Sequence, residues 1–170
     1  AYESTVFFLN QKTFRNLHTG RNRMEKRPII GVMGGGQVSN EQEKAAYRLG
    51  ELIAEKRWIL LNGGRNSGVM EASDKGAFEN GGITIGILPD EDGHRASAYL
   101  TIPVFTGMGS ARNNINALSS DIVVACRGGL GTISEIALAL KSGKTVVLLD
   151  FDPGTVFEEY RQKGRLADAK

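Results

Sequence analysis

The sequence predicts an α/β fold in which helices cover both faces of a mostly parallel sheet. From Pro28 onward, short apolar runs of strand length alternate with longer segments of helical periodicity. Several of the apolar runs end at glycine-rich turns. The chain has 170 residues, of which 41% are hydrophobic, and this is enough for one domain with a substantial core.

Strands are predicted where short apolar runs are bounded by polar or glycine-rich turns. In chain order they lie at 29–33, 58–61, 83–88, 102–105, 121–126 and 144–149. Cys126 ends the fifth run, and we expect it to be a small buried residue, since neither histidine lies near it in the sequence to activate a nucleophile. A single cysteine excludes an intramolecular disulfide and is typical of the reducing cytoplasm.

Helices are predicted between these strands from apolar spacing and from end signals. They lie at 40–57, at 68–79, from the 107–112 turn to Ser119, from the 128–131 turn to Lys141, and at 155–162. Asn40 and Glu43 have the spacing of a capping pair for the first helix. Asn80-Gly81-Gly82 is typical of a left-handed C-terminal cap for the second. Ser142-Gly143 predicts a helix stop before the last strand. Six strands with four or five intervening helices define a single Rossmann-like, doubly wound domain.

The charge is concentrated near the N-terminus. The formal net charge is +2, but basic residues outnumber acidic ones before Pro28 and acidic residues predominate after it. We expect residues 1–27 to be a basic, poorly ordered extension and residues 28–170 to be the domain. If the native start is Met24, residues 1–23 are an upstream leader. Contact with RNA or a membrane and a targeting role are the alternatives for the extension. For the domain we expect neither nucleic acid nor membrane as a partner.

Glycine-rich loops follow four of the predicted strands. The carboxyl ends of parallel strands lie at one edge of the sheet, where ligands bind in such folds. Glycines let the backbone approach a ligand closely, and N–H groups at helix starts attract anions. The sequence therefore predicts a pocket for a small phosphorylated ligand. Its expected lining residues are Gly34, Gly35, Gly36, Gly63, Gly64, Gly107, Gly128, Gly129, Gly131 and Thr132.

Arg112 is the residue most strongly expected to hold an anion. A positive side chain is unfavourable at a helix start unless an anion or a carboxylate lies beside it. With the hydroxyl groups of Thr106 and Ser110, its guanidinium can surround an oxyanion. Glu135 has two interpretations: it caps its helix reciprocally with Thr132, or its carboxylate faces the pocket beside Arg112.

The sequence patterns that are typical of other ligand classes are missing from this chain. The Gly34–Gly36 segment lacks the third glycine of the dinucleotide fingerprint, and no acidic residue ends the second strand, so NAD is not expected. Spacings typical of metal ligands are also missing, so no structural metal is expected. We expect His18 and His94 to be solvated surface residues.

These motifs resemble the Lonely Guy/lysine-decarboxylase-like superfamily over nearly all of residues 28–150. The resemblance rests on Gly-Gly-Arg-Asn-Ser-Gly-Val-Met-Glu at 63–71, on Arg112, and on Gly-Gly-x-Gly-Thr-x-x-Glu at 128–135. Its catalytic branch consists of phosphoribohydrolases, which release a base such as a cytokinin from a nucleoside monophosphate. Arg112 and Glu135 match the catalytic arginine and glutamate of that branch. Asn113, however, stands where that branch has a lysine.

The chain also resembles the molybdenum cofactor carrier proteins, most closely in Gly-Ser-Ala-Arg-x-Asn-Ile-Asn-Ala-Leu-Ser-Ser at 109–120. This resemblance implies a cytoplasmic homodimer or homotetramer that shields molybdenum cofactor (molybdopterin) and hands it over to molybdenum enzymes. It also implies a molybdate or phosphate oxyanion at Thr106, Ser110 and Arg112, with Asn113 among the cofactor-binding residues. We therefore expect a non-catalytic carrier. A phosphoribohydrolase using Arg112 and Glu135 is the alternative, and a nucleotide-sensing regulator is a third possibility.

Overall fold

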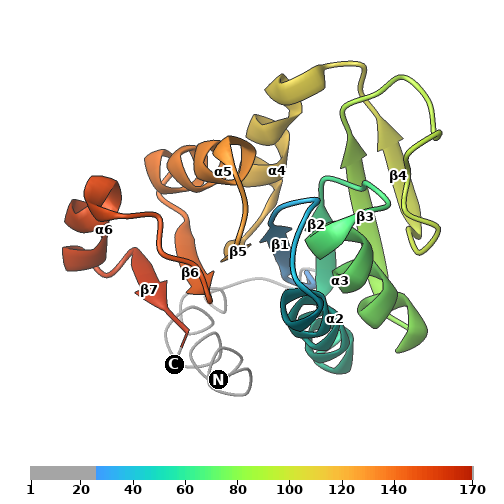
Figure 1. The fold of residues 1–170 in the computed structure, drawn as a ribbon, viewed down its shortest axis with the longest axis horizontal. Coiled ribbons are helices and arrows are strands. Elements are labelled where there is room, and N and C mark those ends of the chain that lie inside the picture. The colour runs from blue at the N-terminus through green and yellow to red at the C-terminus, as the bar shows by residue number, and fades with distance from the viewer. Residues whose placement is uncertain (1–25, 170) are drawn as a thin grey trace.

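The sheet of this protein has seven strands, all parallel, and helices lie on both of its faces (Figure 1). The computed structural model describes residues 26–169, so the predicted extension falls outside it up to residue 25. The strands are β1 (Ile29–Met33), β2 (Ile59–Asn62), β3 (Ile83–Leu88), β4 (Ile102–Phe105), β5 (Ile122–Cys126), β6 (Thr145–Leu149) and β7 (Leu166–Asp168). The predicted fold class is confirmed, and the six predicted strands agree with β1 to β6 to within one residue at each end. Strand β7 was not predicted.

The order of strands across the sheet is β4-β3-β2-β1-β5-β6-β7. The chain proceeds outward from β1 to β4 on one side and from β5 to β7 on the other. The loops that follow β1 and β5 therefore lead to helices on opposite faces of the sheet. Such a point of reversal opens a crevice at the carboxyl ends of the two strands.

The helices lie at α2 (Asn40–Glu55), α3 (Gly68–Glu79), α4 (Asn113–Ser119), α5 (Leu130–Lys141) and α6 (Glu158–Gln162), with single 3-10 turns at Gly109–Arg112 and Thr155–Phe157. Helices α2 and α3 cover one face of the sheet, and α4 and α5 cover the other (Figure 1). None of the helices in residues 26–169 is long and apolar enough to cross a membrane.

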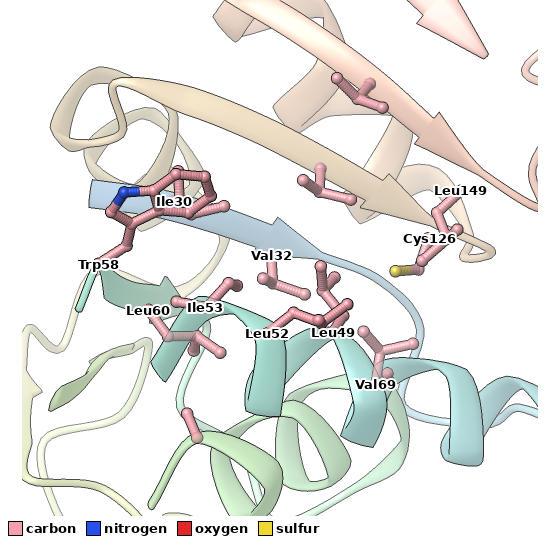
Figure 2. Packing of buried hydrophobic residues seen from close by; sticks show 14 of the residues in the cluster. Ile30, Val32, Leu49, Leu52, Ile53, Trp58, Leu60, Val69, Cys126 and Leu149 are labelled. Atoms are coloured by element: carbon pink, nitrogen blue, oxygen red, sulfur yellow. The ribbon is translucent and has the colours of Figure 1, made fainter. Parts of the chain in front are cut away.

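Strand β5 is apolar at every position, without the alternation of a strand that is buried on one face. Ile122, Val124 and Cys126 belong to the core beneath α2 and α3, whereas Val123 and Ala125 belong to the core beneath α4 and α5. Successive side chains of a strand point to opposite faces, so a strand buried on both faces needs apolar residues at every position. Figure 2 shows the first of these cores, in which β1 packs against α2.

The start of α2 differs from the prediction by one residue. Ser39 is the N-cap: its Oγ accepts a hydrogen bond from the Gln42 N–H at 3.3 Å, and its own N–H donates to Gln42 Oε1 at 3.0 Å. The predicted pair of Asn40 and Glu43 is therefore wrong, because Ser39 has extended backbone angles and Asn40 is already helical.

The predicted C-terminal signals are confirmed. Gly81 has a φ of +70°, and the Gly82 N–H donates to the Ala77 carbonyl at 2.8 Å, as in a left-handed cap. Gly143 ends α5 with a φ of +72°, and β6 begins two residues later.

Cys126 is buried as predicted, and this has a chemical consequence. Burial raises the pKa of its thiol to about 12, and the nearby Asp150 adds to the rise. Because the thiolate is the reactive form, we expect iodoacetamide at pH 8 to leave Cys126 unmodified in the native protein and to alkylate it in denaturant. Intact-mass spectrometry measures both. Alkylation of the native protein at the rate of the denatured one would contradict a buried thiol.

Candidate functional site

A cavity of about 250 Å³ lies in the crevice between the carboxyl ends of β1 and β5. Glycines of three loops and polar residues of α4 and α5 form much of its wall. Among the residues named from the sequence, the cavity is lined by Gly34, Gly35, Gly36, Gly63, Arg112, Asn113, Gly129, Gly131, Thr132 and Glu135. The fold thus brings together ten residues from four separate segments of the chain.

Backbone hydrogen bonds hold the glycine loops against one another. The Gly35 N–H donates to the Arg127 carbonyl at 2.9 Å, and the Gly35 carbonyl accepts from the Val69 N–H at 3.0 Å. A Cβ on Gly34 would lie 2.6 Å from the Val69 side chain, closer than real contacts allow. The glycines therefore let the loop after β1 meet both the loop after β5 and the start of α3.

Gly64 and Gly128 lie outside the lining of the cavity. A Cβ on Gly64 would lie 2.9 Å from the Gly86 Cα, and one on Gly128 would overlap the Thr132 hydroxyl. Both residues thus permit close packing behind the wall. The buried Asn62 supports the same loop, because its Oδ1 accepts from the Gly64 N–H at 2.7 Å and its Nδ2 donates to Asp74 at 2.8 Å.

Thr106, Gly107 and Ser110 lie in the connection between β4 and α4, also outside the lining of this cavity. The Thr106 hydroxyl donates to the Leu88 carbonyl at 2.7 Å and accepts from the Met108 N–H at 3.2 Å. Gly107 has a φ of +60°, and Ser110 is exposed. Their predicted contact with an oxyanion stays a prediction.

Arg112 and Glu135 form an ion pair inside the pocket. Arg112 Nη1 donates to Glu135 Oε1 at 3.4 Å, and the two side chains are only 12% and 8% exposed. The guanidinium lies over Gly63, where a Cβ would come within 2.6 Å of both terminal nitrogens. Burial lowers the pKa of Arg112 and raises the pKa of Glu135.

The interpretation of Glu135 as a helix cap is wrong. Helix α5 begins at Leu130 with Gly129 as its N-cap, too early for Thr132 and Glu135 to form a capping box. Glu135 instead accepts hydrogen bonds from Arg112 and, at 2.8 Å, from Asn116 Nδ2. Asn116 was missed by sequence reasoning. Its spacing of three from Asn113 was the available signal, since this spacing puts both amides on one side of α4.

Asn113 fastens α4 to the start of α5. Its Nδ2 donates to Ser134 Oγ at 2.8 Å and to the Gly131 carbonyl at 3.4 Å. The side chain is buried and lies next to Arg112 in the lining of the pocket. Asn113 therefore has a structural partner at the position where the hydrolytic relatives have a lysine.

Two polar atoms near the pocket are buried without a hydrogen-bond partner among the described residues, namely Arg112 Nε and Asn116 Oδ1. Buried polar groups normally have partners, so an unpaired guanidinium nitrogen suits an external acceptor. The start of α5 has no side-chain cap, which leaves backbone N–H groups facing the same region. The wall therefore fits a phosphate-like group attached to a small molecule. Within residues 26–169, no three His, Cys, Asp or Glu side chains are grouped closely enough to hold a metal ion.

The fold and the pocket define a Rossmann-like α/β protein with a glycine-walled site at the reversal point of its sheet. The chain belongs to the SLOG cluster4 family, whose model matches residues 27–170. This is a LOG-like family, in agreement with the superfamily resemblance found in the sequence.

Within this family, the chain is similar to particular proteins of solved structure. It is 49% identical to the molybdenum cofactor binding protein of the phototrophic bacterium Rippkaea orientalis, with a TM-score of 0.80 and coverage of 86% of this chain and 91% of that one. It is 47% identical to the molybdenum cofactor carrier protein of Chlamydomonas reinhardtii, with a TM-score of 0.78 and coverage of 85% and 91%. An Archaeoglobus fulgidus protein is 49% identical over 132 residues, which is 78% of this chain and 85% of that protein. The resemblance to carrier proteins is confirmed.

Proposed function

We propose that this protein binds, protects and carries molybdenum cofactor in the cytoplasm, without catalysis, and hands it over to molybdenum enzymes. The observation that carries the proposal is the similarity at 47–49% identity, over about 85% of the chain, to a cofactor binding protein and a cofactor carrier protein. In this proposal Thr106, Ser110 and Arg112 hold a phosphate or molybdate oxyanion, and Gly107 and Asn113 are among the residues that bind the rest of the cofactor.

The chemistry of the pocket supports this ligand class. A phosphate monoester is bound by donors that are not already hydrogen-bonded within the protein. Arg112 Nε is such a donor, because it has no partner among the described residues. Glycine walls admit a flat heterocycle because they present backbone without side chains. The glycine segments on both sides of the crevice supply walls of this kind.

Protection of the cofactor tests the proposed function. Cofactor released from a molybdenum enzyme is incubated in air with or without this protein, and its survival is measured by reconstitution of a cofactor-free enzyme. We expect its loss to slow as the protein concentration rises. The absence of protection at saturating protein would contradict the carrier function.

A phosphoribohydrolase is the second candidate, favoured by the buried pair of Arg112 and Glu135. Asn113 argues against a hydrolase, because a neutral amide hydrogen-bonded to Ser134 replaces the lysine of the hydrolytic relatives. We expect no free base or ribose 5-phosphate from AMP or a cytokinin monophosphate, as followed by chromatography. Turnover that disappears in Glu135→Gln would reverse the order of the two candidates.

We infer that the protein forms a homodimer or homotetramer. Ile102, Val104 and Phe105 are exposed along the edge strand β4, and Phe78, Met108 and Leu118 are exposed elsewhere on the surface. Apolar edge strands are usually covered. We expect light scattering to give a multiple of 18.4 kDa for the native protein and a smaller mass for Phe105→Lys. Val156→Lys, at an exposed residue near α6, serves as the control. A monomer in every case would contradict the inference.

A further inference from the structure

Arg65 lies in the loop between β2 and α3 and has no part in the function proposed so far. Its Nη2 lies 3.1 Å from the Asp90 carboxylate, and its side chain is 24% exposed. Its other terminal nitrogen, Nη1, is buried and has no hydrogen-bond partner among the described residues. Arg65 Nη2 is thus paired with Asp90, whereas the N–H groups of Nη1 have no acceptor among the described residues.

The backbone around Arg65 is fixed. Residue 65 forms an antiparallel bridge with Ala96, and the Asn66 N–H donates to the Arg95 carbonyl at 2.9 Å. The preceding Gly64 accepts from the Ser97 N–H at 2.8 Å. The side chain therefore extends from a braced loop, which lowers the entropy cost of using it in recognition.

Asp90 connects Arg65 to the loop that carries the expected oxyanion residues. The backbone carbonyl of Asp90 accepts from the Gly107 N–H at 3.1 Å, and the neighbouring Pro89 carbonyl accepts from the Gly109 N–H at 3.0 Å. Asp90 thus holds the Arg65 guanidinium with its side chain and the turn after β4 with its backbone. Arg65 is placed beside Thr106–Ser110 by these contacts.

Arg112 lies close to Arg65. Its guanidinium packs over Gly63, two residues before Arg65. The two cations are close enough that the charge of Arg65 lowers the pKa of Arg112, although burial is the larger cause. Each arginine keeps one buried N–H nitrogen without a partner, Nη1 in Arg65 and Nε in Arg112. Two neighbouring cations with unused donors are an arrangement that a bound anion would stabilise.

We propose that Arg65 supplies a second guanidinium to the oxyanion site of Arg112, and that Asp90 is the positioning residue that holds it there. The inference rests on the proposed function and deepens it. The ligand group is a tetrahedral oxyanion, as found in molybdate and in a phosphate monoester. A purely structural role, in which Arg65 only ties the 63–67 loop to Asp90, is the opposing interpretation.

Anion binding separates the two interpretations. Sodium molybdate and inorganic phosphate are titrated into the full chain by calorimetry, with Arg65→Gln and Arg65→Lys as variants. Arg48→Gln is the matched control, because Arg48 pairs with Glu51 and Glu55 on α2. We expect Arg65→Gln to bind the anion at least about tenfold more weakly, as for the loss of a charged hydrogen bond. The control should bind like the wild type.

The outcomes also distinguish this inference from the proposed function. If the wild type binds molybdate or phosphate and a folded Arg65→Gln binds it equally well, the Arg65 proposal is overturned and the carrier function stands. If the wild type protects the cofactor but binds neither free anion, the oxyanion site fails and the carrier function again stands. Should Arg65→Gln not fold, Arg65→Lys decides. A weakened affinity supports the proposal, because lysine keeps the charge and loses the planar fork, and an unchanged affinity contradicts it.

Discussion

Arg112→Ala is expected to weaken the binding of molybdenum cofactor by about 1–3 kcal/mol, the usual cost of removing a hydrogen bond to a charged group. This corresponds to roughly a five- to 150-fold loss of affinity. The reason is the position of the side chain, since its guanidinium is buried over Gly63 in the wall of the pocket and its Nε has no partner among residues 26–169. Equilibrium binding, followed through the fluorescence of the oxidised pterin, measures the change.

A second effect of Arg112→Ala must be separated from binding. The variant leaves the Glu135 carboxylate buried without its cation, and an uncompensated buried charge is strongly destabilising. The double variant Arg112→Ala/Glu135→Gln removes this charge as well. We expect it to regain stability relative to Arg112→Ala while cofactor binding stays weak. Recovery of binding together with stability would show that Arg112 acts only through folding.

The pH dependence of stability tests whether the Glu135 carboxyl is buried. Burial raises the pKa of its carboxyl above the ordinary value of 4.5. The folded state therefore holds this proton more tightly than the unfolded state. The stabilisation of the folded state by the protonated carboxyl is fully present below pH 4.5, and it is lost as the pH rises through the folded-state pKa. We expect Glu135→Gln to flatten the stability profile in that range, as measured by urea unfolding at a series of pH values.

Gly50→Ala is expected to destabilise the scaffold strongly. Helices α2 and α3 approach so closely that a Cβ on Gly50 would overlap the Ser73 carbonyl oxygen, and one on Gly76 would overlap the Tyr47 carbonyl oxygen. Backbone atoms cannot rotate away, so the helices must separate. We expect a loss of about 3 kcal/mol, at the upper end of the usual cost of overpacking, and a fall in Tm of roughly 6–12 °C.

Gly131→Ala is the matched control for this change. It is also a helical glycine, but its added Cβ would lie 3.9 Å from Asn113 Nδ2, at ordinary contact distance. Alanine favours a helix over glycine by about 1 kcal/mol, so thermal unfolding should show no loss of stability. Equal falls in Tm for the two variants would mean that helix packing is not what requires Gly50.

The sequence predicted the sheet well because its strands carry a strong signal. Burial on both faces makes β1, β2, β3, β5 and β6 nearly continuous apolar runs. The edge strand β4 is also an apolar run, although its residues are exposed. Strand β7 escaped prediction because it has three residues and only Leu166 is buried, which is too short for any periodicity. The cap of α2 was misplaced because Ser39 with Gln42 and Asn40 with Glu43 have the same spacing. Only the backbone angles at Ser39 decide between these two pairs.

The candidate site was predicted in part. Loops that follow strands converge by topology, so the glycines and Arg112 could be assigned to one pocket from their order in the chain. The sequence could not decide between the two interpretations of Glu135, because α5 begins at a residue that no cap marks, and it missed the contact of Glu135 with Asn116. Arg65 is paired with Asp90 across 25 positions of sequence, and a single sequence carries no sign of such a contact.

Direct binding of the cofactor tests the central claim most simply. Released molybdenum cofactor is mixed with the wild-type protein or with Arg112→Ala/Glu135→Gln, the mixture is passed through gel filtration, and pterin and molybdenum are measured in the protein peak. A carrier of this cofactor retains both with the wild type and much less of both with the double variant. Absence of pterin from the wild-type peak, or equal retention by the two proteins, would contradict a cofactor site built around Arg112.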